Sequence, residues 1–383
     1  MGSNESFIVG IDASNIRHGG GITHLSQLLK YTDSSGQRAI VWSNKNTLSQ
    51  IEDKAWLEKR THKLLEGNLF KRTIWQIFYL RPSLMKSSCS ILFVLGGTFL
   101  TRFKPTVTLH QNLLPFVSKE ILRYGFSRKI CKFYILRITQ SLSFIRSQGV
   151  IFLSEYSKKF IQKTLKRNLM NNRVIPHGVE QRFKSFPKDQ KPIDSYSFNN
   201  PFKMIYVSSI DYYKHQWNVV EAVSSLRNQG YPVELKLYGV ENSGPKKYLD
   251  KSIKEFDPKG HFIHYEDEVD FNNIDKVYKS SDLSIFASSC ETFGQIVLES
   301  MASGLPIACS NKSSMKEIVK DGCVYFNPLE VGEIYESLKT LLDSVELRWT
   351  VANKAYTHAS NYSWEKTSIE TFKFLAQIDK KYK

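Results

Sequence analysis

The chain has 383 residues, of which 41% are hydrophobic and 23% charged, and it carries a formal net charge of +16. This length predicts two domains with sizeable cores, and the ordinary hydrophobic content excludes a disordered chain. No run of 18 apolar residues occurs, so we expect no membrane-spanning helix, and the five scattered cysteines without a C-x-x-C pair argue against a disulfide framework or a zinc site.

The positive charge is concentrated in one half of the chain. Residues 1–200 hold 31 Lys and Arg against 12 Asp and Glu, whereas residues 201–383 hold 22 against 25. A basic surface attracts anionic partners such as lipid headgroups, phosphates or nucleic acid. The start of the chain is short and polar without a signal-peptide pattern, and the cysteines suit a reducing compartment, so we expect a cytoplasmic protein.

The first half alternates apolar runs with amphipathic stretches, which is typical of a parallel, doubly wound α/β sheet. A strand is predicted at Phe7–Ile11, then a turn at Gly19–Gly21 and a helix from about Ile22. The further predicted elements are the strands Ala39–Ser43, Ile91–Leu95, Val107–His110 and Val150–Ser154, and a helix from Glu155 to about Leu165.

Two features of this half could belong to a ligand site. Gly19–Gly21 follows a strand and opens a helix, where backbone N–H groups can approach a phosphate, although a plain turn explains the glycines as well. His110 ends a predicted strand, which is where ligand sites form in such sheets, and its imidazole could donate to a sugar hydroxyl. A structural histidine is the alternative.

Two basic, aromatic stretches, 69–81 and 120–146, also lie in the first half. They interleave Lys and Arg with aromatic and aliphatic residues, as amphipathic helices on anionic membranes do. A solvated helix face over an ordinary core is one alternative. A nucleic-acid surface is another, but no recognised nucleic-acid motif occurs, so we do not expect nucleic acid as the partner.

The stretch Phe183–Pro201 contains three prolines and little apolar periodicity, and it predicts the interdomain linker. A second α/β series follows. Its predicted strands are Met204–Val207, Val233–Tyr238, Phe262–His264, Leu283–Phe286 and Ile307–Ser310. Its predicted helices are Trp217–Asn228, Asn273–Ser280, Glu330–Ser344, Glu346–Ser360 and Ser363–Tyr382.

The segment Ser288–Pro306 joins a strand to a helix and carries Glu291 in the loop, Gly294 before the helix, and Glu299 on the helix. Backbone N–H groups at such a helix start bind anions, and a glycine lets a phosphate come close. Carboxylates on either side could hold the sugar and ribose hydroxyls of a nucleotide-sugar. By spacing alone, an ordinary strand–loop–helix unit is the commoner explanation.

The letters E-T-F-G-Q-I-V-L-E-S-M-A-S-G-L-P-I resemble the E-x7-E segment of retaining GT-B glycosyltransferases, specifically glycosyltransferase family 4. The resemblance implies two doubly wound Rossmann-like domains facing across a cleft, with the C-terminal helix crossing back to the first. We therefore expect an acceptor-side domain at 1–190, completed by about 364–383, and a nucleotide-sugar-binding domain at 201–363.

The resemblance also assigns roles to single residues. It implies that Glu291 positions the sugar, that Glu299 holds the ribose, and that the backbone near Phe293, Gly294 and Gln295 stabilises the diphosphate.

Two further segments match the family in part. Tyr206–His215 resembles G-R-x-x-x-x-K-G, with Lys214 at the Lys position that neutralises the diphosphate. Ser209 stands where Arg is usual and supplies no charge, and His215 stands where Gly is usual. By the same resemblance, Gly20 and Gly21 face the donor diphosphate and His110 lies near the transferred sugar. Val174–Val179 resembles V-I-P-N-G-V, with His177 in place of Asn.

The resulting expectation is a retaining, metal-independent glycosyltransferase that needs no cofactor. It would move a hexose-type sugar from a nucleotide-diphosphate sugar to a glycan or polyprenyl-linked acceptor in bacterial surface polysaccharide synthesis (O-antigen, lipopolysaccharide or capsule). We expect it in the cytoplasm, peripheral on the inner face of the cell membrane. The alternatives are a GT-B sugar-nucleotide epimerase or phosphorylase, and a catalytically idle GT-B scaffold that binds a membrane or another polyanion through its basic half.

Overall fold

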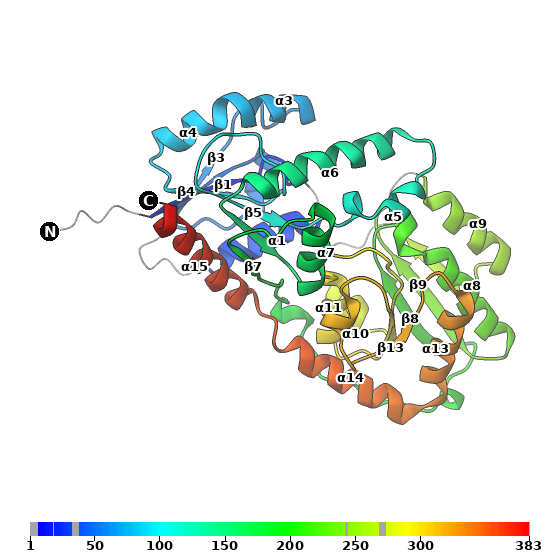
Figure 1. The fold of residues 1–383 in the computed structure, drawn as a ribbon. Coiled ribbons are helices and arrows are strands. Elements are labelled where there is room, and N and C mark those ends of the chain that lie inside the picture. Colours follow the sequence, from blue (N-terminus) through cyan, green and yellow to red (C-terminus); the bar gives the residue numbers. More distant parts are fainter. Residues whose placement is uncertain (1–6, 18, 33–37, 242–243, 268–272, 383) are drawn as a thin grey trace. The chain divides into compact units, whose positions relative to one another are not determined.

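The chain folds into two compact units, each built on one parallel sheet (Figure 1). The computed structural model describes residues 7–17, 19–32, 38–241, 244–267 and 273–382. One unit consists of Met1–Gly178 together with Ser363–Lys383, and the other of Val179–Tyr362. The chain therefore leaves the first unit at Gly178 and returns to it at Ser363.

The first unit has a seven-stranded parallel sheet in the order β3-β2-β1-β4-β5-β6-β7. The strands are β1 Ile8–Asp12, β2 Arg38–Trp42, β3 Leu57–Arg60, β4 Ile91–Val94, β5 Thr106–His110, β6 Gly149–Phe152 and β7 Asn172–Val174. The central strands β1, β4, β5 and β6 are buried along their whole length, as strands covered on both faces must be.

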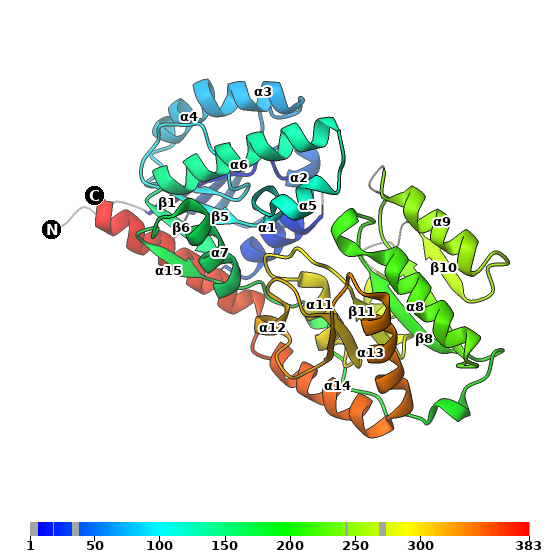
Figure 2. The same ribbon diagram turned by 45° about the vertical axis from the view of Figure 1, so that its right-hand side comes forward.

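Helices cover both faces of this sheet. They are α1 Gly20–Lys30, α2 Lys45–Ser49, α3 Leu69–Ile74, the π-helical turn η1 Trp75–Tyr79, α4 Leu80–Lys86, the 3₁₀ turn η2 Leu114–Phe116, α5 Ser118–Leu122, α6 Arg128–Arg146, α7 Glu155–Leu165 and α15 Trp364–Tyr382. Figures 1 and 2 show α3, α4 and α6 on one face, and α1 with α15 on the other.

The second unit has a six-stranded parallel sheet in the order β10-β9-β8-β11-β12-β13. The strands are β8 Phe202–Val207, β9 Val233–Tyr238, β10 Ile263–Glu266, β11 Leu283–Phe286, β12 Ile307–Ser310 and β13 Val324–Phe326. The helices are η3 Gln181–Phe183, η4 Ile193–Ser195, η5 Tyr212–Lys214, α8 Gln216–Asn228, α9 Lys246–Phe256, α10 Ile274–Lys279, α11 Gln295–Ala302, α12 Met315–Ile318, α13 Val331–Asp343 and α14 Val345–Ala359.

The strand order of each sheet reverses once. In the first sheet β1 lies between β2 and β4, and in the second sheet β8 lies between β9 and β11. The loops that leave the carboxyl ends of two such neighbouring strands turn to opposite faces, and the crevice between them is where open α/β sheets bind ligands. The second sheet therefore brings the loop after β8 next to the loop after β11.

The two doubly wound sheets predicted from the sequence are confirmed, and every predicted strand is present with its ends shifted by a few residues at most. Three strands were not predicted: β3, β7 and β13. Each lies at an edge of its sheet. Their residues are mostly only half-buried, so no continuous apolar run marks them in the sequence.

The segment predicted as the linker, Phe183–Pro201, belongs to the second unit. Phe183 is buried and its ring lies 5.9 Å from that of Tyr278. The Ser185 N–H donates to the Ala302 carbonyl over 2.9 Å, and the buried Arg348 guanidinium donates to the Lys191 carbonyl. The predicted boundary at residue 190 therefore falls inside the second unit, because scattered side-chain contacts and hydrogen bonds, which leave no periodic apolar pattern, hold this segment in place.

Candidate functional site

Seven of the ten predicted site residues lie in the second unit, on the two loops that leave β8 and β11. Ser209 and Lys214 follow β8, and the other five follow β11: Glu291, Phe293, Gly294, Gln295 and Glu299. Because β8 and β11 are hydrogen-bonded neighbours, their loops meet at the switch point of this sheet. The topology thus gathers residues that are far apart in the sequence.

Lys214 and Glu291 form an ion pair at this point. The Lys214 ammonium donates to Glu291 Oε1, and the two side chains are only 6% and 17% exposed. Ser288 Oγ donates to the same carboxylate oxygen over 2.7 Å. The Lys214 Nζ also lies 5.1 Å from the centre of the Phe286 ring. The predicted diphosphate-binding cation and the predicted sugar-binding carboxylate are therefore each other's charge partners in this structure.

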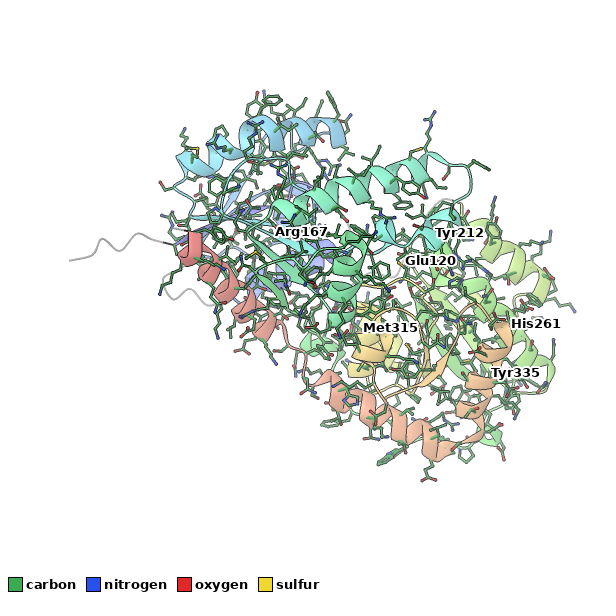
Figure 3. The ribbon with its side chains drawn as sticks, in the orientation of Figure 1. Glu120, Arg167, Tyr212, His261, Met315 and Tyr335 are labelled. Atoms are coloured by element: carbon green, nitrogen blue, oxygen red, sulfur yellow. The ribbon has the colours of Figure 1, made fainter. Side chains whose placement is uncertain are left out.

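Gly294 sets the start of α11 in a conformation that favours glycine. Its φ is +96°, in the left-handed region, and a Cβ there would lie 2.6 Å from Met315 Cε (Met315 is labelled in Figure 3). No side chain caps this helix start. A helix start without a side-chain cap can bind an anion through its first-turn N–H groups, which is the role that the sequence pattern predicts for α11.

The loop before Gly294 is held by neighbouring serines. The Glu291 N–H donates to Ser313 Oγ over 3.1 Å, and Ser314 Oγ donates to the Phe293 carbonyl over 3.1 Å. The Phe293 side chain is buried and its ring lies 5.6 Å from that of Tyr362. Phe293 therefore contributes its side chain to the core, which leaves only its backbone to act in the site.

Glu299 lies one turn into α11 and is 6% exposed. Burial raises its pKa to about 8, and the nearby Glu180 carboxylate acts in the same direction. A hydrogen bond from Gln295 Nε2 to Glu299 Oε1, 3.4 Å long, and the positive charge of Arg182 oppose this rise. In the substrate-free protein at neutral pH, Glu299 is therefore mainly a neutral carboxyl, which can both donate and accept a hydrogen bond.

The loop after β8 is held by hydrogen bonds, and it carries one cation fewer than the pattern of the resembling family. Ser209 is half-buried, and its carbonyl accepts from Gln216 Nε2 over 2.9 Å. His215 has a φ of +49°, and its Nε2 lies 2.9 Å from Ser289 Oγ. This left-handed conformation gives the physical reason why the resembling family has glycine at the position of His215.

The remaining three predicted residues, Gly20, Gly21 and His110, lie in the first unit. Gly20 and Gly21 begin α1, whose start has no side-chain cap. Gly19, which the sequence places in the same glycine turn, has the left-handed φ of +63° that favours glycine, and a Cβ at Gly20 would meet nothing within 4 Å. The uncapped helix start agrees with the predicted anion site but does not test it.

His110 is enclosed by aromatic rings. It is 1% exposed, and its ring lies 5.5 Å from Phe144, 5.7 Å from Phe152 and 6.0 Å from Phe116. Burial lowers its pKa to about 3, and the backbone of Asn112 only partly opposes this shift, so the imidazole is neutral. A role for His110 beside the sugar stays a prediction.

Neither a cluster of metal ligands nor a membrane-spanning helix occurs among the residues that the structure describes. No three of their His, Cys, Asp or Glu side chains lie together as metal ligands would. None of their helices has both the length and the apolar character that crossing a bilayer requires.

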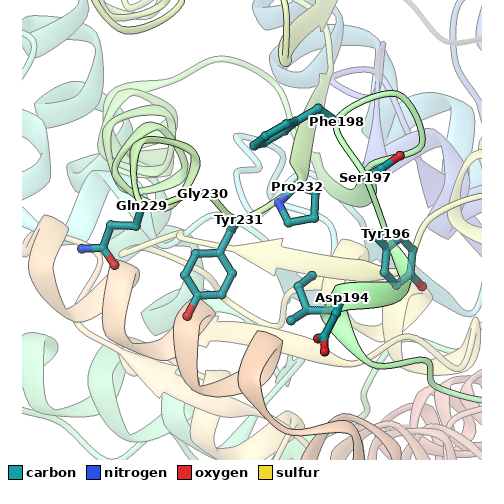
Figure 4. Close-up of a pocket in the computed structure, with 9 residues that line it drawn as sticks. Asp194, Tyr196, Ser197, Phe198, Gln229, Gly230, Tyr231 and Pro232 are labelled. Atoms are coloured by element: carbon teal, nitrogen blue, oxygen red, sulfur yellow. The ribbon is translucent and has the colours of Figure 1, made fainter.

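A cavity of about 460 Å³ lies at the other end of the second sheet, beside the amino ends of β8 and β9. Figure 4 shows the rings of Tyr196, Phe198 and Tyr231 around it. None of the predicted site residues lines this cavity.

Exposed apolar side chains gather on one face of the first unit. On α3, η1 and α4 they are Leu69, Phe70, Ile77, Phe78 and Met85; on α5, α6 and the loop between them they are Leu122, Phe126, Ile135, Ile138 and Leu142. In both views α3, α4 and α6 lie on the same side of the sheet (Figures 1 and 2). We call these ten residues the apolar surface of the first unit.

The second unit matches a known protein family. Residues 188–358, all within that unit, match the family model for glycosyl transferases group 1. The O-antigen chain mannosyltransferase B of Escherichia coli is 24% identical over 171 residues, which are 44% of this chain and 44% of that protein. The chain spans about half or less of the curated relatives that it matches, from 22% to 54% of the first four.

Solved structures match nearly the whole chain. Sucrose-phosphate synthase from Thermosynechococcus elongatus has a TM-score of 0.78 at 14% identity, covering 97% of this chain and 99% of that one. Anabaena Alr3699/HepE, solved in complex with UDP, has a TM-score of 0.69 at 16% identity, covering 97% of this chain and 100% of that one. At such identities the likeness establishes the fold alone. The chain therefore has the GT-B fold, and its residues 188–358 match the group 1 glycosyl transferases.

Proposed function

We propose that this protein is a retaining glycosyltransferase that moves a hexose-type sugar from a nucleotide-diphosphate sugar to a glycan or polyprenyl-linked acceptor. The observation that carries the proposal is the Lys214–Glu291 ion pair beside the uncapped start of α11. A cation, a carboxylate and the N–H groups of a helix start are the three kinds of group that a diphosphate joined to a sugar requires.

In the proposed donor complex, Lys214 and the N–H groups after Gly294 bind the diphosphate, and Glu291 binds sugar hydroxyls. Glu299 binds the ribose, since a neutral carboxyl can donate to one hydroxyl and accept from the other. The Anabaena relative was solved with UDP, which makes a uridine nucleotide the first candidate.

The proposed reaction is a front-face substitution. The bond between the anomeric carbon and the diphosphate oxygen breaks, and the acceptor hydroxyl forms a new bond to that carbon from the same side. The hydroxyl proton passes to the departing phosphate oxygen. Lys214 and the backbone N–H groups of α11 stabilise the negative charge that develops on the diphosphate. The reaction as proposed needs no metal, and an activity that EDTA abolishes and a divalent cation restores would contradict it.

The proposed setting is the synthesis of a bacterial surface polysaccharide at the inner face of the cell membrane. The similarity to an O-antigen mannosyltransferase supports this setting. The apolar surface of the first unit, with its neighbouring Lys and Arg residues, supports a peripheral attachment to anionic lipid.

Nucleotide binding tests the proposal most directly. We would measure thermal unfolding of wild type and Glu299→Ala with UDP, GDP, dTDP, CDP and ADP. A nucleotide at about 100 times its dissociation constant adds about 2.7 kcal/mol to the stability of the wild type. One nucleotide should stabilise the wild type and not the variant. Stabilisation by none of them would contradict the proposed donor site.

A catalytically idle scaffold is the second candidate, and one observation favours it. Ser209 supplies no charge where the resembling family has Arg. One cation, Lys214, is therefore predicted at the diphosphate site where that family has two. Release of free nucleotide from a donor, in the presence of acceptor, separates the enzyme from the scaffold.

A further inference from the structure

The first unit contains a cavity of about 340 Å³ that none of the predicted site residues lines. It lies between the carboxyl ends of β2 and β3 and the helical segment formed by η1 and α4. Its aromatic walls are Trp42, Trp75 and Tyr79, and its cationic or ring N–H donors are Arg60, His62 and Lys86.

The aromatic walls are held in a fixed arrangement. The rings of Trp75 and Tyr79 are parallel within 4°, with centres 6.2 Å apart, and the His62 ring lies 5.0 Å and 5.1 Å from them. Both aromatic residues belong to η1, a π-helical turn, and such turns are rare and often mark functional sites. Flat, rigid rings of this kind suit the apolar face of a pyranose ring.

The polar groups of the cavity are mainly donors. The Arg60 guanidinium donates from Nε to Glu58 Oε1 and from Nη1 to Ser87 Oγ, and each hydrogen bond is 2.5 Å long. Its Nη2 has no partner among the described residues. His62 Nδ1 accepts from the Leu64 N–H over 3.2 Å, so a neutral His62 carries its proton on Nε2 as a donor.

Two more donors line the cavity. Trp75 is 2% exposed, and its buried Nε1–H has no hydrogen-bond partner in the described part of the chain. Lys86 is an exposed cation on α4. Two carboxylates lie close to Arg60 and His62 in the sequence: Glu58 pairs with Arg60, and Glu66 accepts from the Thr61 hydroxyl over 2.9 Å. The donors of this cavity therefore suit an occupant that brings acceptors, and a negative charge suits it best.

The cavity wall is tied to the loop between β1 and α1. Gln76 Nε2 donates to Asp12 Oδ2 over 2.7 Å and to Ser14 Oγ over 3.2 Å. Arg72 Nη1 donates to Asn15 Oδ1 over 2.9 Å. This loop leads to Gly20 and Gly21, the predicted donor-side glycines. An occupant of the cavity is thereby joined, through η1, to the carboxyl edge of the first sheet where the fold places ligands.

We infer that this cavity is the subsite for an acceptor saccharide that carries an anionic substituent, a carboxylate or a phosphate. The aromatic rings take the sugar ring, and Arg60 and Lys86 take the charge. The inference rests on the proposed function in treating the occupant as an acceptor glycan. It names a substrate class that the donor site does not define.

Four probes separate the parts of this inference: glucuronate, glucose 6-phosphate, glucose and inorganic phosphate. Quenching or enhancement of tryptophan fluorescence in the full chain reports binding, because Trp42 and Trp75 line the cavity. At least one of the two charged sugars should bind about tenfold more tightly than glucose and than inorganic phosphate, and the tighter one identifies the substituent. Equal binding of glucose overturns the role of charge, and equal binding of inorganic phosphate overturns the role of the sugar ring.

Variants on the same face locate the binding. Lys86→Met should weaken binding of the charged sugar about tenfold, and Arg60→Met as much. Arg81→Met is the matched control, since Arg81 lies exposed on α4 and does not line the cavity. If Arg60→Met fails to fold after losing its Glu58 contact, Lys86→Met decides the question. Equal weakening by Arg81→Met would show a diffuse charge effect and overturn the inference.

Thermal stabilisation by UDP and the other nucleoside diphosphates, measured on the same samples, keeps the two proposals apart. Nucleotide binding without binding of either charged sugar overturns this inference and leaves the proposed function standing. If neither a nucleotide nor a charged sugar binds, both the proposed function and this inference are overturned.

Discussion

At the scale of single residues, the Lys214–Glu291 ion pair organises the candidate site. Both side chains are largely buried, and each is the other's charge partner. In the proposed reaction the diphosphate replaces Glu291 at Lys214, which releases the carboxylate for the sugar hydroxyls. The ion pair therefore holds both side chains in position for the donor.

Replacing Lys214 should affect stability and activity separately. Lys214→Met leaves the Glu291 carboxylate buried without its cation, so the free energy of unfolding should fall by about 3 kcal/mol. Lys214→Met/Glu291→Gln should recover part of that loss in urea unfolding, because no unpaired charge remains. Both variants should lose about 100-fold or more in transfer rate. A double variant no more stable than the single one would show that the pair does not act as described.

Glu299 should give the stability a measurable pH dependence. Its pKa is raised by burial from 4.5 to about 8, so unfolding releases a proton between these values. The stability that the neutral carboxyl provides is complete below about pH 4.5 and is lost as the pH rises through about 8. The loss amounts to about 1.4 kcal/mol per pH unit within that window.

Glu299→Gln is the matched variant, because it keeps the shape and removes the titration. Urea unfolding at pH 5, 7 and 8.5 should find the two proteins similar at pH 5 and the variant progressively more stable at higher pH. Parallel pH profiles would mean that Glu299 is not buried in solution as it is here.

At the scale of elements, the sequence predicts the buried central strands and misses the half-buried edge strands. Strands such as β4 and β6 are apolar because helices cover both faces, and their residues therefore form continuous runs. The edge strands β3, β7 and β13 have no such run. The segment 183–201 has the composition of a linker, but isolated contacts such as Phe183 with Tyr278 and Phe186 with Tyr356, which show no periodicity, attach it to the second unit.

The site divides in the same way. Glu291, Gly294 and Glu299 could be found because they lie in one contiguous segment with a recognisable pattern. The contact of Glu291 with Lys214 joins residues 77 apart and depends on the pairing of β8 with β11, which a single sequence does not encode locally. The cavity beside η1 was missed because its lining residues are dispersed from Trp42 to Lys86.

The starts of α11 and α1 should respond differently to alanine. Gly294→Ala forces a side chain into a left-handed φ of +96° and against Met315, so it should cost about 2 kcal/mol and weaken nucleotide binding. Gly20→Ala meets nothing within 4 Å and should cost no stability. Thermal unfolding with and without nucleotide measures both. A Gly294→Ala protein as stable as wild type would contradict the described start of α11.

At the scale of the whole molecule, the first unit closes on itself where the chain leaves and returns. A Cβ at Gly178 would lie 2.0 Å from the Trp364 N atom and 2.3 Å from the Ser363 carbonyl carbon. Beside this contact, His24 Nδ1 and His177 Nδ1 lie 3.0 Å apart, and both rings lie against Trp364. The first unit is therefore completed by α15 through a contact with no room for a side chain.

Gly178→Ala should destabilise the protein by about 3 kcal/mol, since backbone atoms rather than a mobile side chain block the space. Gly332→Ala on α13 is the control, because it meets nothing within 4 Å and should be neutral or stabilising by up to about 1 kcal/mol. Chemical denaturation of both variants measures the difference. Equal stability would show that α15 does not pack at Gly178 in solution.

The apolar surface of the first unit should bind anionic membranes. Ile135 and Ile138 are 62% and 61% exposed on α6, on a half of the chain with a large excess of Lys and Arg. Exposed apolar residues among basic ones bind anionic membranes by inserting between headgroups that the cations attract. The protein should therefore sediment with anionic vesicles at low salt and less with neutral vesicles.

Ile135→Glu/Ile138→Glu should reduce the bound fraction about tenfold or more, because the variant loses two apolar side chains and gains two negative charges that anionic lipid repels. Trp349→Glu, at a 52% exposed position on α14 of the second unit, should change it little. Equal sedimentation with neutral vesicles, or an equal effect of Trp349→Glu, would mean that this surface does not hold the protein at the membrane, and the proposed acceptor would then have to reach the protein free of lipid.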